Sequence, residues 1–169
     1  MDEFARFLAT IADLKAAGRW EEIINLIGKR LRHLMGVNLK EFRDLTESGL
    51  FSQLIINGPM ATVWVPYKQI MLIALLKETG DYAAMREPPE GGNGWYLRAL
   101  DLLLDALSND ELRHYSHLAP TVEVLLTSLG NSPLPVRTLT SLIREYKRRG
   151  LSIETIEESM AKIIENPRT

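Results

Sequence analysis

The sequence predicts an all-α protein built from antiparallel helix pairs. Apolar residues recur at the spacings i, i+3, i+4 and i+7 through most of the 169-residue chain, which is the pattern of a buried helix face. Glycine and proline fall between these periodic stretches, where helices are expected to end. No segment alternates polar and apolar residues as a strand does. We therefore expect a single all-helical domain over residues 1–169, a length that one core can serve.

The N-terminal part predicts two regular helices joined by a tight turn. The first carries its apolar stripe over residues 4–14 and ends near Gly18, and the second carries its stripe over 20–34 and ends at Gly36. Glycine is favoured just after a helix because it adopts positive φ without strain. The pair should therefore form a helical hairpin.

The next segment, residues 37–63, is less regular and predicts short helices. One should follow Asn38 and include residues 39–45, and another should include residues 50–54. The run Asn-Gly-Pro at residues 57–59 then interrupts the chain.

A longer helix should begin near Pro66, because proline is tolerated in the first helical turn. Its apolar pattern continues past an internal glycine to about Arg86, and two prolines then prevent it from continuing. Residues 87–94 are interpreted as an inter-helix loop. The helix that follows, over 95–107, has so many apolar residues that it should be buried on more than one side and lie at the centre of the fold.

The loop composition also permits a phosphate-binding loop. That motif requires a Lys and a Ser or Thr after its last glycine, whereas Gly94 is followed by Trp95 and Tyr96. Prolines that stop one helix and glycines that let the chain reverse account for the composition without a ligand. A plain connection is therefore favoured, and contact of the loop with a partner is the alternative.

The C-terminal third repeats the helical pattern. Helices are expected over residues 110–118, 120–129 and 134–149, with Gly150 ending the last of these. Ser152 should then cap a final helix.

Two of the helical turns share a pattern centred on glycine, with matched positions in the flanking helices. These positions are Phe7, Leu14, Gly18 and Ile23 in the first copy, and Leu139, Tyr146, Gly150 and Thr155 in the second. The pattern resembles the tetratricopeptide repeat, a helix-turn-helix unit of about 34 residues. The order of the elements also resembles a bacterial family of unknown function with tetratricopeptide-like helices. The resemblance implies a degenerate right-handed superhelix of stacked helix pairs, and it implies no enzymatic activity.

Composition limits the compartment and the class of partner. The chain has 20 basic and 22 acidic residues, a formal charge of -2, so its overall charge does not favour nucleic acid or an anionic membrane. It has no cysteine, which excludes disulfides and thiol chemistry and suits a reducing compartment. No apolar stretch is long enough to span a bilayer, and the acidic N-terminus is unlike a secretory signal. We expect a soluble cytoplasmic protein.

One set of residues has the spacing of metal ligands on a helix. Glu111, His114 and His117 would lie near one face if that helix were continuous. A two-metal site within a helical bundle needs further carboxylates and a second such motif on other helices, and the sequence has no second motif. We therefore interpret these residues as a polar surface and expect no metal or other cofactor. Catalytic motifs are also missing, so we expect no enzyme, with an unrecognised active site as the alternative.

The candidate binding feature is a basic stripe in the penultimate helix. Arg137, Arg144 and Arg148 recur at i, i+7 and i+11, with Lys147 adjacent, and a helix would align them. The tetratricopeptide resemblance implies that these positions line a concave groove and hold peptide carboxylates. A solvated helix face is the alternative. We therefore predict an interaction module for a protein partner, whose acidic peptide segment these residues hold; a homo-oligomer is left open.

A second basic run, residues 29–33, supports a competing hypothesis of an RNA-binding surface. The acidic overall charge and the lack of aromatic residues interleaved with the basic ones argue against it. Nucleic acid is therefore not the expected partner.

Overall fold

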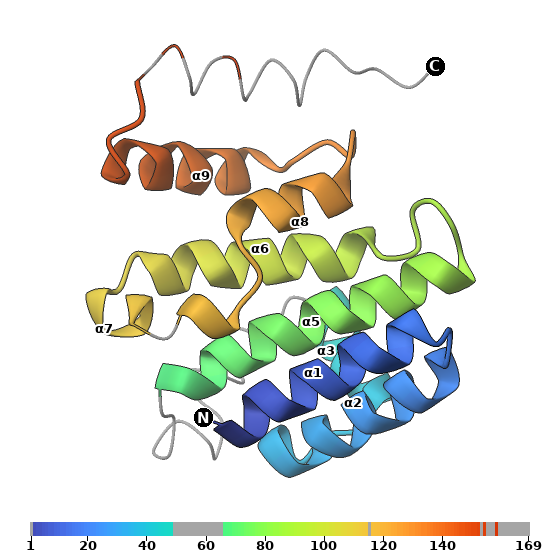
Figure 1. Cartoon of the computed structure of the whole chain (residues 1–169). Helices are drawn as coiled ribbons and strands as arrows, with labels where there is room; N and C mark the ends of the chain where they lie inside the picture. The colour runs from blue at the N-terminus through green and yellow to red at the C-terminus, as the bar shows by residue number, and fades with distance from the viewer. Residues whose placement is uncertain (1, 49–65, 115, 153, 155–157, 159–169) are drawn as a thin grey trace.

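The computed structural model describes residues 2–48, 66–114, 116–152, 154 and 158 (Figure 1). Within these ranges all regular elements are helices and no strand is present, so the all-α prediction is confirmed. The elements are α1 (Asp2–Ala16), α2 (Trp20–Met35), α3 (Leu39–Ser48), α5 (Pro66–Arg86), α6 (Asn93–Leu107), α7 (Asp110–Arg113), the 3-10 helix η1 (Ser116–Leu118), α8 (Val122–Leu129) and α9 (Val136–Arg148).

The helices are stacked in layers, with α1 and α2 at one end, α5 and α6 in the middle, and α8 and α9 at the other end (Figure 1). The pairs α1–α2 and α5–α6 each run antiparallel. The most extensive contact joins α5 to α6, and α6 also packs against α8 and α9. The central position predicted for α6 is therefore confirmed. Its buried residues are Tyr96, Ala99, Leu100, Leu102, Leu103, Leu104, Ala106 and Leu107.

The other central helix, α5, is buried around its whole circumference along residues 69–76. A helix that is apolar on all sides must be covered on all sides. Here α2 and α6 supply much of that cover. Each fully buried Leu or Ile stabilises the fold by about 1.5–3 kcal/mol relative to an exposed position. The α5–α6 pair is therefore the core on which the outer helices are placed.

Two glycines, Gly80 within α5 and Gly92 just before α6, allow close packing of the two helices. A Cβ on Gly80 would lie 2.6 Å from Cε1 of Tyr96, and a Cβ on Gly92 would lie 2.4 Å from the carbonyl oxygen of Gly80. Among the residues described, positive φ occurs at Gly18, Gly36, Gly130 and Gly150. The chain reverses at this loop as expected, although its glycines do so without positive φ. Gly80 and Gly92 allow α5 and the start of α6 to touch.

The predicted ends of the N-terminal helices are confirmed. Gly36 has φ 70° and its N–H donates to the Arg32 carbonyl, which ends α2. Asn38 then starts α3 with a capping box, in which its Oδ1 accepts from the Glu41 N–H at 2.9 Å and the Glu41 carboxylate accepts from the Asn38 N–H at 2.8 Å. The short helix predicted over 50–54 lies outside the described residues.

The helix predicted over 110–118 is broken in the structure. α7 ends at Arg113, and a separate turn of 3-10 helix follows. Arg113 turns its side chain back to α6, where its Nε donates to the Leu107 carbonyl at 2.7 Å, and to α9, where it binds Glu145. These tertiary contacts stop a helix that local periodicity would continue.

A side-chain cap begins α8, and a proline precedes α9. α8 starts after Thr121, whose hydroxyl oxygen accepts from the Val124 N–H at 3.1 Å. α9 starts at Val136, two residues later than predicted, because Pro135 favours an extended conformation before the helix. Apart from Glu154 and Glu158, the helix predicted after Ser152 lies outside the described part of the chain. Among the helices described, none has the length and apolarity needed to cross a membrane.

Candidate functional site

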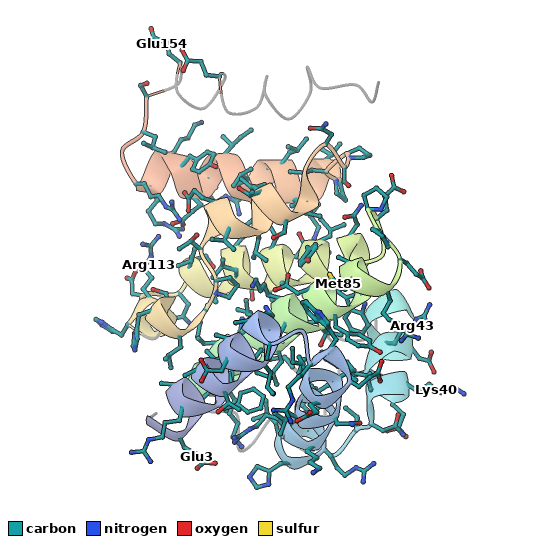
Figure 2. The ribbon with its side chains drawn as sticks, turned by 45° about the vertical axis from the view of Figure 1, so that its right-hand side comes forward. Glu3, Lys40, Arg43, Met85, Arg113 and Glu154 are labelled. Atoms are coloured by element: carbon teal, nitrogen blue, oxygen red, sulfur yellow. The ribbon has the colours of Figure 1, made fainter. Side chains whose placement is uncertain are left out.

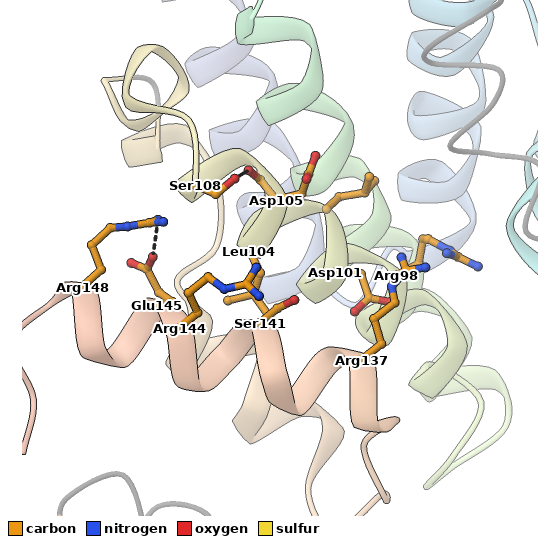
Figure 3. Close-up of a pocket in the computed structure, with 11 residues that line it drawn as sticks. Arg98, Asp101, Leu104, Asp105, Ser108, Arg137, Ser141, Arg144, Glu145 and Arg148 are labelled. Carbon is orange, nitrogen blue, oxygen red and sulfur yellow. Dashed lines mark hydrogen bonds and ion pairs between the residues drawn. The ribbon is translucent and has the colours of Figure 1, made fainter. Parts of the chain in front are cut away.

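A groove of about 320 Å³ lies between α6 and α9 (Figure 3). We call it the α6–α9 groove. Its α9 side is formed by residues at the helical spacing i, i+4, i+7 and i+11, together with one buried carboxylate. The lining residues are Arg137, Ser141, Arg144, Glu145 and Arg148 from α9, and Arg98, Asp101, Leu102, Leu104, Asp105 and Ser108 from α6 and its end.

Three of the four residues predicted to bind a peptide line this groove. Figure 3 shows Arg137, Arg144 and Arg148 rising from α9 toward α6. Lys147 is exposed and is not among the lining residues. The opposite side of α9 packs on the fold through Leu142 and Tyr146, so the arginines lie at the edge of a packed helix interface. The helical spacing thus brings the arginines together as expected and leaves the lysine out.

One of these arginines is held by the fold. The Arg148 Nη1 donates to the Leu107 carbonyl at 2.8 Å and lies 3.3 Å from the Glu145 carboxylate. Glu145 is 2% exposed, and it also accepts from Arg113 at 2.9 and 3.0 Å and from Arg149 at 3.1 Å. A buried carboxylate requires such partners, since an unpaired charge in the interior is costly. Arg148 therefore joins α9 to the end of α6.

Arg137 and Arg144 differ from Arg148 because both are exposed and no hydrogen bond or ion pair connects either one to another residue of the described chain. Across the groove, the Asp101 carboxylate already has a partner, since its Oδ1 accepts a hydrogen bond from the Thr138 hydroxyl at 2.7 Å. The groove contains four arginines and three acids, so its formal charge is positive. Its available donors are two guanidinium groups that can each hold a carboxylate through paired hydrogen bonds.

The α6 side of this groove was not singled out from the sequence as a site. Asp101 and Asp105 form an acidic i, i+4 pair on α6, which by itself predicts only a strip of an apolar helix in contact with water. With Arg98 they follow the spacing i, i+3 and i+7, so the signal was a polar strip on an otherwise apolar helix. That strip faces the basic stripe of α9 (Figure 3).

The predicted metal-ligand spacing loses its structural basis because the helix is not continuous. α7 ends at Arg113, so His114 lies in a turn and His117 in η1. Both histidines are exposed, and the Nδ1 of His117 lies 3.2 Å from the His114 carbonyl oxygen. The side chain of Glu111 is outside the described part. Among the side chains that are described, no three potential ligands converge. The absence of a metal remains a prediction.

A second charged cluster joins α1, α5 and α6. Asp81 accepts hydrogen bonds from the Lys77 Nζ at 2.6 Å and the Tyr96 hydroxyl at 2.7 Å, and it also accepts one from Lys15. Burial alone would raise the pKa of Asp81, but the hydrogen bonds from Lys15, Lys77 and Tyr96 outweigh burial and lower it. Lys15 also forms an ion pair with Glu78. Since these groups satisfy one another, we interpret the cluster as structural.

Comparison of the chain with models of protein families, with curated proteins and with solved structures found no match. A function can therefore be inferred only from the residues of the chain itself, because fold class alone does not imply a function.

Proposed function

We propose that the protein is a helical-repeat interaction module whose α6–α9 groove binds an acidic peptide segment of a protein partner. The observation that carries the proposal is the pair Arg137 and Arg144, which line the groove without partners in the described chain. The stacking of the antiparallel pairs α1–α2 and α5–α6 supports a degenerate tetratricopeptide-like right-handed superhelix as the scaffold.

The spacing of the two arginines sets the spacing of the ligand charges. They are seven residues apart on α9, which corresponds to about 10 Å along a helix axis. A peptide in the polyproline II conformation has three residues per turn and rises about 3.1 Å per residue. Two carboxylates separated by two other residues would therefore lie on the same side of the peptide, about 9 Å apart, and reach both guanidinium groups. The expected ligand contains an acid-x-x-acid segment in polyproline II conformation.

The acids of the groove restrict this ligand. Asp105 is exposed at the α6 side, and Asp101 from α6 and Glu145 from α9 also line the groove. Carboxylates repel a ligand that carries charge at every position. A peptide with two separated acids can meet the arginines and avoid these residues, whereas a polyphosphate chain cannot. The groove therefore favours a sparsely charged peptide.

A peptide-display selection tests the proposal. Selection on the wild-type protein should enrich acid-x-x-acid sequences, and selection on an Arg137→Gln, Arg144→Gln double variant should not. An enriched peptide should bind the double variant at least about tenfold more weakly, which corresponds to about 1.4 kcal/mol. Lys147→Gln is the matched control, because Lys147 is an exposed cation on α9 outside the groove. Circular dichroism should show unchanged helicity in all variants.

Two outcomes would contradict the proposal. The first is enrichment of sequences without acids, and the second is equal binding of an enriched peptide to the wild-type and double-variant proteins. An enzyme is the remaining alternative, and turnover in a broad substrate screen, lost on mutation of groove residues, would favour it.

A further inference from the structure

A second concave surface is formed by α2, α3, α5 and the start of α6. It consists of two adjoining pockets, of about 780 and 700 Å³, which share Ile24 and Leu39 in their linings. We call this surface the α2–α5 groove. The second basic run of the sequence contributes to it, although Arg30 of that run turns away and lies over the Phe7 ring of α1 at 4.8 Å. The basic lining residues are Lys29, Arg32, His33, Lys40, Arg43 and Arg86.

The charge of this groove is opposite to that of the whole chain. Its two linings contain five Lys and Arg residues and a single acid, Glu87, although the chain carries a formal charge of -2. Figure 2 shows Lys40 and Arg43 reaching outward from α3. Arg86 forms an ion pair with Glu21 at 3.0 Å, with both side chains more than half exposed. Such an exposed pair contributes only about 0–1 kcal/mol, so a phosphate can replace the carboxylate.

Two aromatic side chains stand among these cations. Tyr82 of α5 and Trp95 of α6 line the same pocket as Lys40 and Arg43. Trp95 packs against Phe42, with ring centroids 5.5 Å apart, which holds the indole in place. Neither Tyr82 nor Trp95 is near residues 29–33 in sequence, and the fold brings them into the pocket that adjoins the one lined by this basic run. The lack of interleaved aromatic residues, which argued against nucleic acid, therefore does not hold in three dimensions.

We propose that the α2–α5 groove binds a single-stranded polynucleotide. A cationic groove that follows the phosphates and aromatic rings on which bases stack are the two elements of such sites. An acidic peptide would pair with the cations and would make no use of the Tyr82 and Trp95 rings as stacking surfaces for bases. Two pockets in series suit a chain of several nucleotides better than one small molecule. The proposal is independent of the α6–α9 groove, since it depends on other helices and other residues.

Fluorescence anisotropy with labelled oligouridylate and oligothymidylate of 5, 10 and 20 nucleotides tests this inference on the full chain. Affinity should rise with length and fall with salt, and the two arms show whether RNA or DNA is preferred. A Lys40→Gln, Arg43→Gln double variant should bind more weakly, and its salt slope should decrease by roughly 0.7 for each lost phosphate contact. Tyr82→Leu should weaken binding about fivefold or more, because one stacked base contributes about 1–3 kcal/mol.

Lys147→Gln is the matched control here as well, and the Arg137→Gln, Arg144→Gln variant should bind oligonucleotides as the wild-type protein does. The inference is overturned if no oligonucleotide binds at low salt, if the Lys40, Arg43 variant binds unchanged, or if uridine monophosphate binds as tightly as the 20-nucleotide chain. Equal competition by polyglutamate, matched to oligouridylate in charge, would also overturn it, since binding would then depend on charge alone. Loss of oligonucleotide binding with retained peptide binding would leave the proposed function standing.

Discussion

Replacing Glu145 with Gln should destabilise the fold at the base of the α6–α9 groove. The Glu145 carboxylate is 2% exposed and accepts hydrogen bonds from Arg113, Arg148 and Arg149. A neutral amide keeps the shape of the side chain, but it has a single oxygen acceptor, and its N–H groups can only donate. The three guanidinium groups would lose the negative charge they share.

The size of the effect depends on how much water reaches the arginines. Removing one partner of a fully buried ion pair costs about 3–5 kcal/mol. The side chains of Arg113, Arg148 and Arg149 are 33%, 37% and 32% exposed, so water restores part of their solvation. We therefore expect the free energy of unfolding to fall by about 2 kcal/mol, between the values for buried and exposed pairs. For a chain of this size, this corresponds to a fall in Tm of about 4–8 °C.

Urea denaturation followed by circular dichroism measures this change. Glu123→Gln is the matched control, because Glu123 is 57% exposed and pairs with Arg149 at 2.6 Å. Its loss should cost less than about 1 kcal/mol. The reasoning would be refuted if Glu145→Gln reduced the free energy of unfolding by less than about 0.5 kcal/mol, or by no more than Glu123→Gln.

Three further substitutions, one of them with a matched control, test the packing and electrostatics. Asp81→Asn should lower the free energy of unfolding at pH 7. Because the pKa of Asp81 is lowered in the folded state, its carboxylate contributes to the free energy of unfolding above the unfolded pKa and loses this contribution as the pH falls. The difference in free energy of unfolding between the variant and the wild-type protein, measured by urea titration, should therefore shrink below about pH 4. Gly80→Ala should destabilise the fold by about 1–3 kcal/mol, because its Cβ would lie 2.6 Å from the Tyr96 ring. Gly28→Ala is the control and should stabilise α2, because its Cβ would have nothing within 4 Å. Equal Tm shifts of the two variants would contradict this. Thr138→Val should cost about 1.5–3 kcal/mol, because it removes the hydrogen bond to the Asp101 carboxylate; an unchanged urea midpoint would contradict this assignment.

Local patterns predicted the long elements well and the short ones poorly. α5 begins at Pro66 and ends at Arg86 as expected, because a first-turn proline and a pair of prolines after the helix act on the local backbone. α7 ends early because Arg113 contacts Leu107 and Glu145, and Glu145 is distant in sequence. Periodicity carries no information on such a contact. The packing role of Gly92 was missed for the same reason, since the Gly80 carbonyl that requires it belongs to another helix.

The candidate site was predictable to the extent that it follows helix geometry. The spacing of Arg137, Arg144 and Arg148 predicts that they share a face of α9, and they do line one groove. Whether each arginine is available to a ligand depends on a different quantity, the position of Glu145 relative to α6 and α7. The buried carboxylate forms an ion pair with Arg148. Arg137 and Arg144 have no partner in the described chain. Helical spacing determines which residues are grouped, and tertiary contacts determine which of them are free.

The two grooves differ as binding surfaces in the acids and aromatic rings of their linings. Both contain several basic residues, so a count of cations would assign them the same ligand. The α6–α9 groove has three acids in its lining, and the exposed one, Asp105, repels a densely charged chain. The α2–α5 groove has one acid in its lining and two aromatic rings among its cations. If both proposals hold, the number and placement of the acids explain why a sparsely acidic peptide binds in one groove and a polynucleotide in the other. The net charge of -2 is a sum over the whole chain, so it is compatible with two grooves that each carry more basic than acidic residues.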